Sequence, residues 1–310
     1  MRILSYSAPM LSLIPVKNAL ALTPNGVKWQ EMLLPHFGHW LNTFKMLPSG
    51  SKISLFLLAW VIFWLPIALP LGKKLHWQPF QPLSVAQKLP LLVPLYLIVP
   101  LLAWFTLMVE GTSLSDYGLS WRSQLLVSLI LGIVMGVSGL GIIFALESRL
   151  GWLKWHPENL ISLGKVALPI LGLGLWIGFT EEFVFRGIFQ TILEQDYEKW
   201  LAAIIASSIF ALVHLLWERK ETIPQLPGLW MMGMVLVLAR IVDEGSLGLA
   251  WGLHAGWVWG LSCLDAAQMI SYKDEKIEWI IGINKQPLAG VMGILCLLGT
   301  GLILWQWPLL

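Results

Sequence analysis

The feature that most constrains this 310-residue sequence is a series of long apolar stretches without a charged residue. Three of them, at 53–72, 89–109 and 125–146, reach the roughly 20 residues that a helix needs to cross a bilayer core. Backbone polar groups must be paired inside lipid, so a spanning segment is either a helix or part of a closed barrel. Continuous apolarity, without the alternation of a half-buried strand, predicts helices.

Five further apolar stretches, some of them shorter, lie at 166–180, 201–216, 228–238, 247–264 and 289–308. The stretch at 228–238 is expected to continue through Arg240 to Val242. The sequence thus predicts an all-α, polytopic bundle of about eight spans. The protein is expected to be a multi-pass integral membrane protein. Composition agrees, because 12% of the residues are charged, against about 25% in a soluble domain.

The net charge of +2 provides no field that would attract nucleic acid, so no nucleic-acid partner is predicted. Membrane lipid is the partner that the composition implies, and nothing indicates the oligomeric state. Cys263 and Cys296 lie in apolar stretches, and we interpret them as small core residues.

Two adjacent carboxylates, Glu181 and Glu182, stand at the end of the apolar stretch 166–180. Charges at membrane depth cost a few kcal/mol each and usually mark function. Glu182 and Arg186 are four residues apart in the favourable order, so they can pair on one helix face. Glu181 is rotated by about 100° from Glu182 and can face another helix. The alternative is that both acids cap the span at headgroup level.

Two histidines, His214 and His254, each lie inside a later apolar stretch. Either one alone is explained by a hydrogen bond between helices. Together with Glu181 they can supply a general base and oxyanion stabilisers. The same three side chains are also candidate ligands for zinc or another divalent metal, with one position open for water.

Two other polar features have structural interpretations. Gly136-Val-Ser138-Gly139 matches the nucleophile pattern of rhomboid serine proteases, but close packing of small residues explains it more simply. Asp243 and Glu244 precede Gly245-Ser246 and are interpreted as a solvated connector.

Three ordered elements resemble the CAAX-protease and bacteriocin-processing family (CPBP, or Abi) of intramembrane peptidases, which includes the type II CAAX prenyl endopeptidase. They are Glu181-Glu182-Phe-Val-Phe-Arg186, Phe210-Ala-Leu-Val-His214, and the later segment that contains His254. The strong resemblance covers 180–264. It implies a helical membrane fold with a water-reachable cavity and hydrolysis of peptide bonds near the membrane surface.

Carried over by position, the resemblance implies that Glu181 and His214 activate water. It also implies that Glu182 with Arg186 holds the site together and that His254 stabilises the oxyanion. It leaves open whether the enzyme is a metalloprotease or depends on the glutamate alone. Family substrates include prenylated C-terminal peptides, bacteriocin leaders and anti-sigma factors, so the expected partner is a protein or peptide, with prenylation as one option.

One position departs from the family pattern. Val258 stands four residues after His254, where Asn or Asp is usual, and valine can neither donate a hydrogen bond nor bind a metal. Trp257, Trp259 and Ser262 are the nearest candidates to replace that donor. The alternative is a catalytically weak or inactive membrane scaffold or regulator on the same fold. A proton-coupled transporter that uses the Glu and His side chains is a third hypothesis.

We predict four parts along the chain. Residues 1–50 form an N-terminal segment whose spacing favours an interfacial amphipathic helix, although Pro35 interrupts it; an organelle transit segment is the alternative. Residues 51–160 hold the N-terminal transmembrane helices, and 161–266 form the CPBP-like catalytic core. Residues 267–310 provide a loop and the last transmembrane helix. The apolar residues of the predicted amphipathic helix are Trp29, Leu33, Leu34, Phe37, Trp40, Leu41 and Phe44.

Overall fold

The computed structural model describes residues 40, 42–77, 84–216, 219–273 and 277–307. The chain divides into two compact units, residues 1–47 and 48–310. In the first unit, residue 40 and residues 42–45 are helical. Most of the predicted N-terminal amphipathic helix lies outside the described residues. The division of the rest of the chain into three parts stays a prediction.

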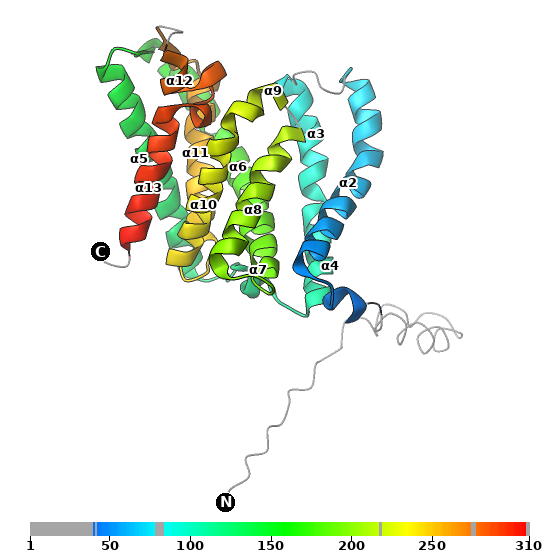
Figure 1. Ribbon diagram of the computed structural model, residues 1–310. Coiled ribbons are helices and arrows are strands. Elements are labelled where there is room, and N and C mark those ends of the chain that lie inside the picture. The colour runs from blue at the N-terminus through cyan, green and yellow to red at the C-terminus, as the bar shows by residue number, and fades with distance from the viewer. Residues whose placement is uncertain (1–39, 41, 78–83, 217–218, 274–276, 308–310) are drawn as a thin grey trace, which may run out of the picture. The chain divides into compact units, whose positions relative to one another are not determined.

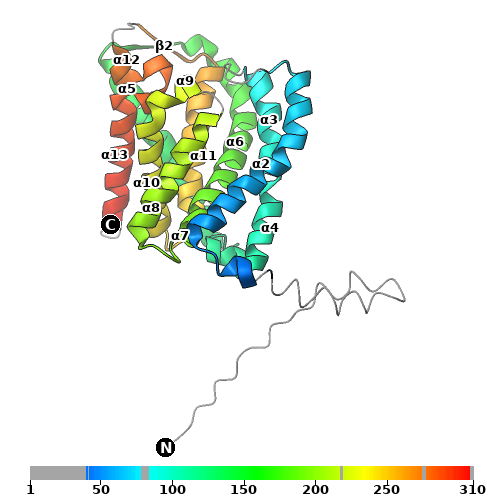
Figure 2. The same ribbon diagram turned by 45° about the vertical axis from the view of Figure 1, so that its right-hand side comes forward.

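The second unit is a bundle of helices that run alongside one another (Figures 1 and 2). Its main helices are α2 (Ser49–Lys74), α3 (Val85–Leu97), α4 (Val99–Glu110), α5 (Ser123–Arg149), α6 (Leu160–Glu182), α8 (Lys199–Val213), α10 (Leu226–Val242), α11 (Gly248–Ala266) and α13 (Val291–Gln306). Within the described residues, six helical segments are long and apolar enough to cross a membrane, and α13 is a shorter apolar helix. The predicted all-α membrane fold is confirmed, whereas the count of eight spans stays a prediction.

Short elements connect these helices. They are α7 (Gln190–Leu193), α9 (Arg219–Thr222), α12 (Glu278–Ile281), the π-helix Phe183–Phe189, and single 3-10 turns at Leu114–Tyr117, Pro157–Asn159, His214–Leu216, Ile223–Gln225, Ile283–Lys285 and Pro287–Ala289. Strands β1 (Leu153–Trp155) and β2 (Ile270–Tyr272) pair antiparallel, with Lys154 opposite Ser271. His156 ties this ribbon together, since its ring nitrogens lie 2.8 Å from Glu158 Oε1 and 2.8 Å from Ser271 Oγ.

Proline divides the second predicted span, 89–109, into two helices. Helix α3 ends at Leu97 and α4 begins at Val99, with Pro100 in the first turn of α4. Proline lacks the N–H that would continue the ladder of helical hydrogen bonds, and its ring clashes with the preceding turn. The break therefore follows from the sequence, although apolarity alone does not reveal it.

Helix α11 packs against both α5 and α6 because glycines line the two contacts. On the α5 side, a Cβ atom on Gly252 would lie 2.1 Å from Leu129 O, and one on Gly132 would lie 2.5 Å from Leu249 O. On the α6 side, a Cβ on Gly178 would lie 3.2 Å from Ala255 N. No larger residue fits the α5 contact, so small residues bring the backbones close in the way that is common among membrane helices.

The Gly-x-Ser-Gly pattern in α5 belongs to this packing. A Cβ on Gly136 would lie 3.0 Å from Leu253 O in α11. Ser138 points away from this contact and is exposed. The structural interpretation of the pattern therefore suits the geometry better than a serine nucleophile does.

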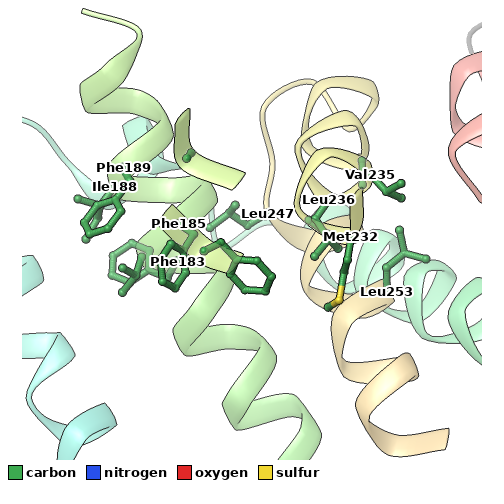
Figure 3. Close-up of a cluster of buried hydrophobic side chains, with 14 of the residues drawn as sticks. Phe183, Phe185, Ile188, Phe189, Met232, Val235, Leu236, Leu247 and Leu253 are labelled. Atoms are coloured by element: carbon green, nitrogen blue, oxygen red, sulfur yellow. The ribbon is translucent and has the colours of Figure 1, made fainter. Parts of the chain in front are cut away.

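Aromatic side chains anchor the segment that follows the acidic pair. All seven residues of the π-helix are buried. Phe185 packs edge-on against Phe189 and Phe210, with ring centroids 5.4 and 5.2 Å apart. Figure 3 shows Phe183 and Phe185 within a cluster of buried side chains that includes Leu247 and the labelled residues of α10 and α11. This packing fixes the backbone immediately after Glu181 and Glu182.

Asp243 has a structural role that the sequence did not predict. Its Oδ2 accepts a hydrogen bond from Leu249 N at 3.1 Å, and its Oδ1 accepts one from Ser128 Oγ at 2.6 Å. Asp243 thus caps the N-terminus of α11 and ties it to α5. Asp243 and Glu244 lie in the predicted connector between α10 and α11; Glu244 is exposed, whereas Asp243 is half-buried and makes these two contacts.

The glycine contact between α5 and α11 can be tested with Gly252→Ala. The added methyl group would meet Leu129 O, so we expect a loss of stability of about 1–3 kcal/mol, as for other overpacked sites. Gly141→Ala is the control, because a Cβ there meets nothing within 4 Å. Unfolding in detergent measures both variants, and equal stability of the two would contradict the packing described above.

Candidate active site

The last two residues of α6 are Glu181 and Glu182, and the π-helix begins directly after them. A π-helix is rare and occurs frequently at functional sites. Here it carries Arg186 back towards the acidic pair. Glu182 and Arg186, which have opposite charges, are thus only four residues apart in one buried stretch of the chain.

Glu182 is the centre of a buried cluster of polar side chains. Its Oε1 lies 3.0 Å from Arg186 Nη1 and 2.7 Å from His254 Nδ1. Glu182, Arg186 and His254 are 0, 1 and 3% exposed. The Arg186 guanidinium also lies 4.2 Å from the centroid of the Phe210 ring. Burying a charge without partners is very costly, so these contacts are what allow the carboxylate to be there.

Glu181 has a different environment. The Tyr96 hydroxyl, from α3, donates a hydrogen bond to Glu181 Oε1. Glu181 Oε2 is buried and has no hydrogen-bond partner in the described part of the chain. It lies 3.7 Å from His254 Nε2 and 3.9 Å from His214 Nε2. One carboxylate oxygen is therefore held, and the other faces two imidazole rings.

The hydrogen bonds of the two histidines define which ring nitrogen faces Glu181. His214 Nδ1 lies 2.7 Å from the Phe210 carbonyl oxygen, and His254 Nδ1 lies 2.7 Å from the Glu182 carboxylate. Both partners are acceptors, so each Nδ1 carries the hydrogen. In the neutral rings, each Nε2 keeps a lone pair that can accept a proton or bind a metal.

Two cavities adjoin these side chains. The larger, of about 510 Å³, is lined by Glu181, His214 and Tyr96 among mostly apolar residues of the surrounding helices. The smaller, of about 190 Å³, is lined by His214, His254, Trp257 and Val258. His214 borders both cavities, and its side chain is 30% exposed, against 12% for Glu181. A small molecule such as water can therefore approach Glu181 from the side of His214.

All five predicted site residues come together. Two aromatic residues contact them: Tyr96 bonds to Glu181, and the Phe210 ring lies beside Arg186. Tyr96 was missed, because a single tyrosine in an apolar stretch gives no sign of its partner. Of the three candidates to replace a donor at position 258, Trp259 is already engaged, since its Nε1 donates to Ala167 O at 2.8 Å. Trp257 Nε1 is buried without a partner among the described residues.

The predicted metal would be held by Glu181, His214 and His254. In the part of the chain that the structure describes, no group of three or more His, Cys, Asp or Glu side chains could hold a metal ion. Ligand atoms about 2.0–2.1 Å from a tetrahedral zinc lie about 3.4 Å apart. The 3.9 Å between Glu181 Oε2 and His214 Nε2 exceeds this. The metal therefore stays a prediction, and no chemical step below depends on it.

Residues 163–260 match the family model described as type II CAAX prenyl endopeptidase Rce1-like. This part of the chain is thus Rce1-like, and it contains both acids and both histidines. The predicted resemblance is confirmed for this segment. The family is one of integral membrane proteases, which supports a membrane peptidase as the class of protein. No curated protein and no solved structure matched the chain.

The buried ion pair can be tested with Arg186→Met. Removing the guanidinium leaves Glu182 with one partner fewer in a buried position, so we expect a loss of about 3–5 kcal/mol of stability. Glu182→Gln in the same protein removes the uncompensated charge and should recover part of the loss. Denaturant titration in detergent measures the three proteins. If Arg186→Met alone were as stable as the wild type, the Glu182–Arg186 pair would not stabilise the site.

Proposed function

We propose that this protein is an intramembrane endopeptidase of the CAAX type, in which Glu181 and His214 activate the attacking water. The observation that carries the proposal is the free Glu181 Oε2, which faces the Nε2 atoms of His214 and His254 at 3.9 and 3.7 Å. A general base needs a reachable proton acceptor beside the reacting group, and a buried carboxylate with one unoccupied oxygen supplies it.

The reaction follows from these positions. Two atoms 3.7–3.9 Å apart can both lie at hydrogen-bond distance from one water. Glu181 takes a proton from this water, and the water oxygen attacks the peptide carbonyl carbon while His214 orients it. The proton passes to the amide nitrogen as the C–N bond breaks. The products are one chain with a new carboxyl terminus and one with a new amino terminus.

The other side chains position the reacting groups. The Tyr96 hydrogen bond occupies Glu181 Oε1, which leaves Oε2 to receive the proton. His254 Nδ1 donates to Glu182, so His254 can present a second N–H only as a cation. Such a cation beside the carbonyl would offset the negative charge that develops on the oxyanion.

The substrate proposal is an apolar peptide, with a prenylated C-terminal peptide as the first candidate. The cavity next to Glu181 is lined mainly by apolar side chains, including Leu57, Leu92 and Ile177. Apolar walls around a few polar groups are typical of sites that bind apolar ligands. The description of the matched family names the prenyl CAAX class.

A scaffold or regulator on the same fold remains the alternative, and Val258 is the observation that favours it. Val258 lines the smaller cavity beside His254 and offers no polar atom. The alternative predicts that cells lacking the protein are restored by a Glu181→Gln variant as well as by the wild type. A peptidase requires that they are not.

Glu181→Gln should reduce cleavage of a farnesylated peptide by at least 100-fold, because the amide cannot act as the base. Folding should be retained, since the amide can still accept the Tyr96 hydrogen bond. The measurement is mass-spectrometric product formation by purified protein in detergent or proteoliposomes, with the unfolding temperature recorded in parallel. Undiminished cleavage would refute the role of Glu181. The same assay after chelator treatment tests separately whether a divalent metal is required.

Tyr96→Phe should lower kcat by about 10-fold with little change in KM, because the loss of one hydrogen bond frees the carboxylate to rotate. Tyr197→Phe, at an exposed tyrosine, is the control. Steady-state kinetics on the same peptide distinguish the two. Equal kcat values for both variants would remove Tyr96 from the positioning network.

A further inference from the structure

Arg240 is a cationic residue in the last turn of the apolar helix α10, and no step of the proposed reaction uses it. A charged residue in a membrane-spanning helix is costly and usually marks a function. Its guanidinium carries five N–H groups in a fixed planar fork and stays protonated. In this structure it donates three hydrogen bonds, all of them to uncharged oxygens. The side chain is therefore suited to join several segments at once.

The three hydrogen bonds of Arg240 go to three different segments. Its Nη1 donates to the backbone carbonyl oxygen of Arg186, in the π-helix. Its Nη2 donates to Thr191 Oγ1, in α7, at 3.1 Å, and its Nε donates to Gly245 O, in the turn before α11, at 3.1 Å. One side chain thus bonds to the stretch that follows the two glutamates and to the turn that precedes the helix of His254.

The Arg186 carbonyl oxygen loses its α-helical partner in the π-helix. In an α-helix, the N–H of Gln190 would bond to Arg186 O, four residues back. Here that N–H reaches Phe185 O, five residues back, at the end of the π-helix. A buried carbonyl oxygen without a partner costs free energy. Arg240 Nη1 supplies a donor to Arg186 O, and it thereby favours the π form over the α form of this segment.

The π form of this segment determines where the Arg186 side chain points. Bonding over five residues instead of four widens each turn, so the direction of the following side chains changes. Arg186 Nη1 lies 3.0 Å from Glu182 Oε1, which also lies 2.7 Å from His254 Nδ1. A return to α-helical bonding would therefore move Arg186 relative to Glu182. It would disturb the carboxylate that orients the His254 ring.

Arg240 also closes the turn that leads into α11. Gly245 N donates to Arg240 O at 2.8 Å, and Arg240 Nε donates to Gly245 O at 3.1 Å. Both backbone polar groups of Gly245 are thus bonded to one residue. His254 follows in the second turn of α11. The position of this turn therefore helps to set where the imidazole meets Glu182.

We propose that Arg240 is a positioning residue, which keeps residues 183–189 in the π form and so holds Arg186, Glu182 and His254 in register. The kinetic consequence rests on the proposed peptidase function, whereas the effect on the His254 ring does not. Arg240 does not touch the reacting atoms; it acts through the Glu182 carboxylate.

The kinetic test is Arg240→Met, which keeps an unbranched side chain and removes every donor. A misplacement of about 1 Å can cost a site about 100-fold in rate. We expect kcat on a farnesylated peptide to fall by about 10- to 100-fold and KM to stay within about 3-fold, because the effect reaches the substrate only through the site's geometry. Arg122→Met, at an exposed arginine before α5, is the control and should keep its kcat within about 3-fold of wild type. Equal kcat values for the two variants would overturn the inference.

If Arg240→Met fails to fold, Arg240→Lys replaces it. Lysine keeps the charge, but its compact ammonium lacks the planar fork that reaches three oxygens in fixed directions. We expect a folded protein whose kcat is lowered, by less than in a variant without any donor. A wild-type kcat in Arg240→Lys would overturn the inference.

Nitrogen NMR of the histidines separates this inference from the proposed function. In ¹⁵N-histidine-labelled wild type, His254 Nδ1 carries the hydrogen and Nε2 does not, so the two nitrogens resonate apart. His254→Gln assigns these resonances. In Arg240→Met we expect them to move towards each other, because the ring is no longer held in one tautomer. In Arg122→Met they should stay in place.

The outcomes of the two measurements distinguish the claims. If the His254 resonances move in Arg240→Met and the wild type cleaves no peptide, the peptidase is refuted and the positioning role of Arg240 stands. If the resonances stay in place in a folded Arg240→Met protein, the positioning role is overturned whether or not the wild type cleaves.

Discussion

The Glu182 carboxylate is the group on which the rest of the site depends. It is buried in an apolar bundle, where a charge without partners would be prohibitively costly. Arg186, from the π-helix, and His254, from α11, both bond to its Oε1. These two contacts fix the position of the π-helix relative to α11. They also fix the hydrogen on His254 Nδ1, and with it the free Nε2 that faces Glu181.

The approach of α11 to its neighbours makes those contacts possible. Gly132 and Gly252 leave no room for a Cβ between α5 and α11, and Gly174 and Gly178 allow α6 to come close on the other side. A histidine on α11 can then reach a glutamate on α6 directly. Small residues in the sequence therefore have a chemical consequence, because they set the distance between the acid and the imidazole.

Much of the fold could be predicted because lipid restricts what an apolar stretch can become. Long apolar segments without alternation favour helices, and the described residues of each predicted stretch are mainly helical, with 89–109 divided between α3 and α4. Three-residue strands such as Leu153–Trp155 are too short to show a period of two, so the β-ribbon was not predicted. The π-helix was not predicted either, because its residues have the same apolar composition as an α-helix.

The candidate site, like the fold, could be predicted only in part. The pairing of Glu182 with Arg186 follows from spacing within one segment, and it could be predicted. The contacts of His254 with Glu182 and of Tyr96 with Glu181 join different helices, and spacing along the chain holds no information about them.

The central claim is that two adjacent glutamates have separate roles, Glu181 in the chemistry and Glu182 in holding the site. Cleavage rate and unfolding temperature, measured side by side for Glu181→Gln and Glu182→Gln, test it most directly. The account predicts that Glu181→Gln loses cleavage at an unchanged unfolding temperature, whereas Glu182→Gln unfolds at a lower temperature. A Glu181→Gln protein that cleaves normally, or a Glu182→Gln protein with wild-type stability, would contradict the account.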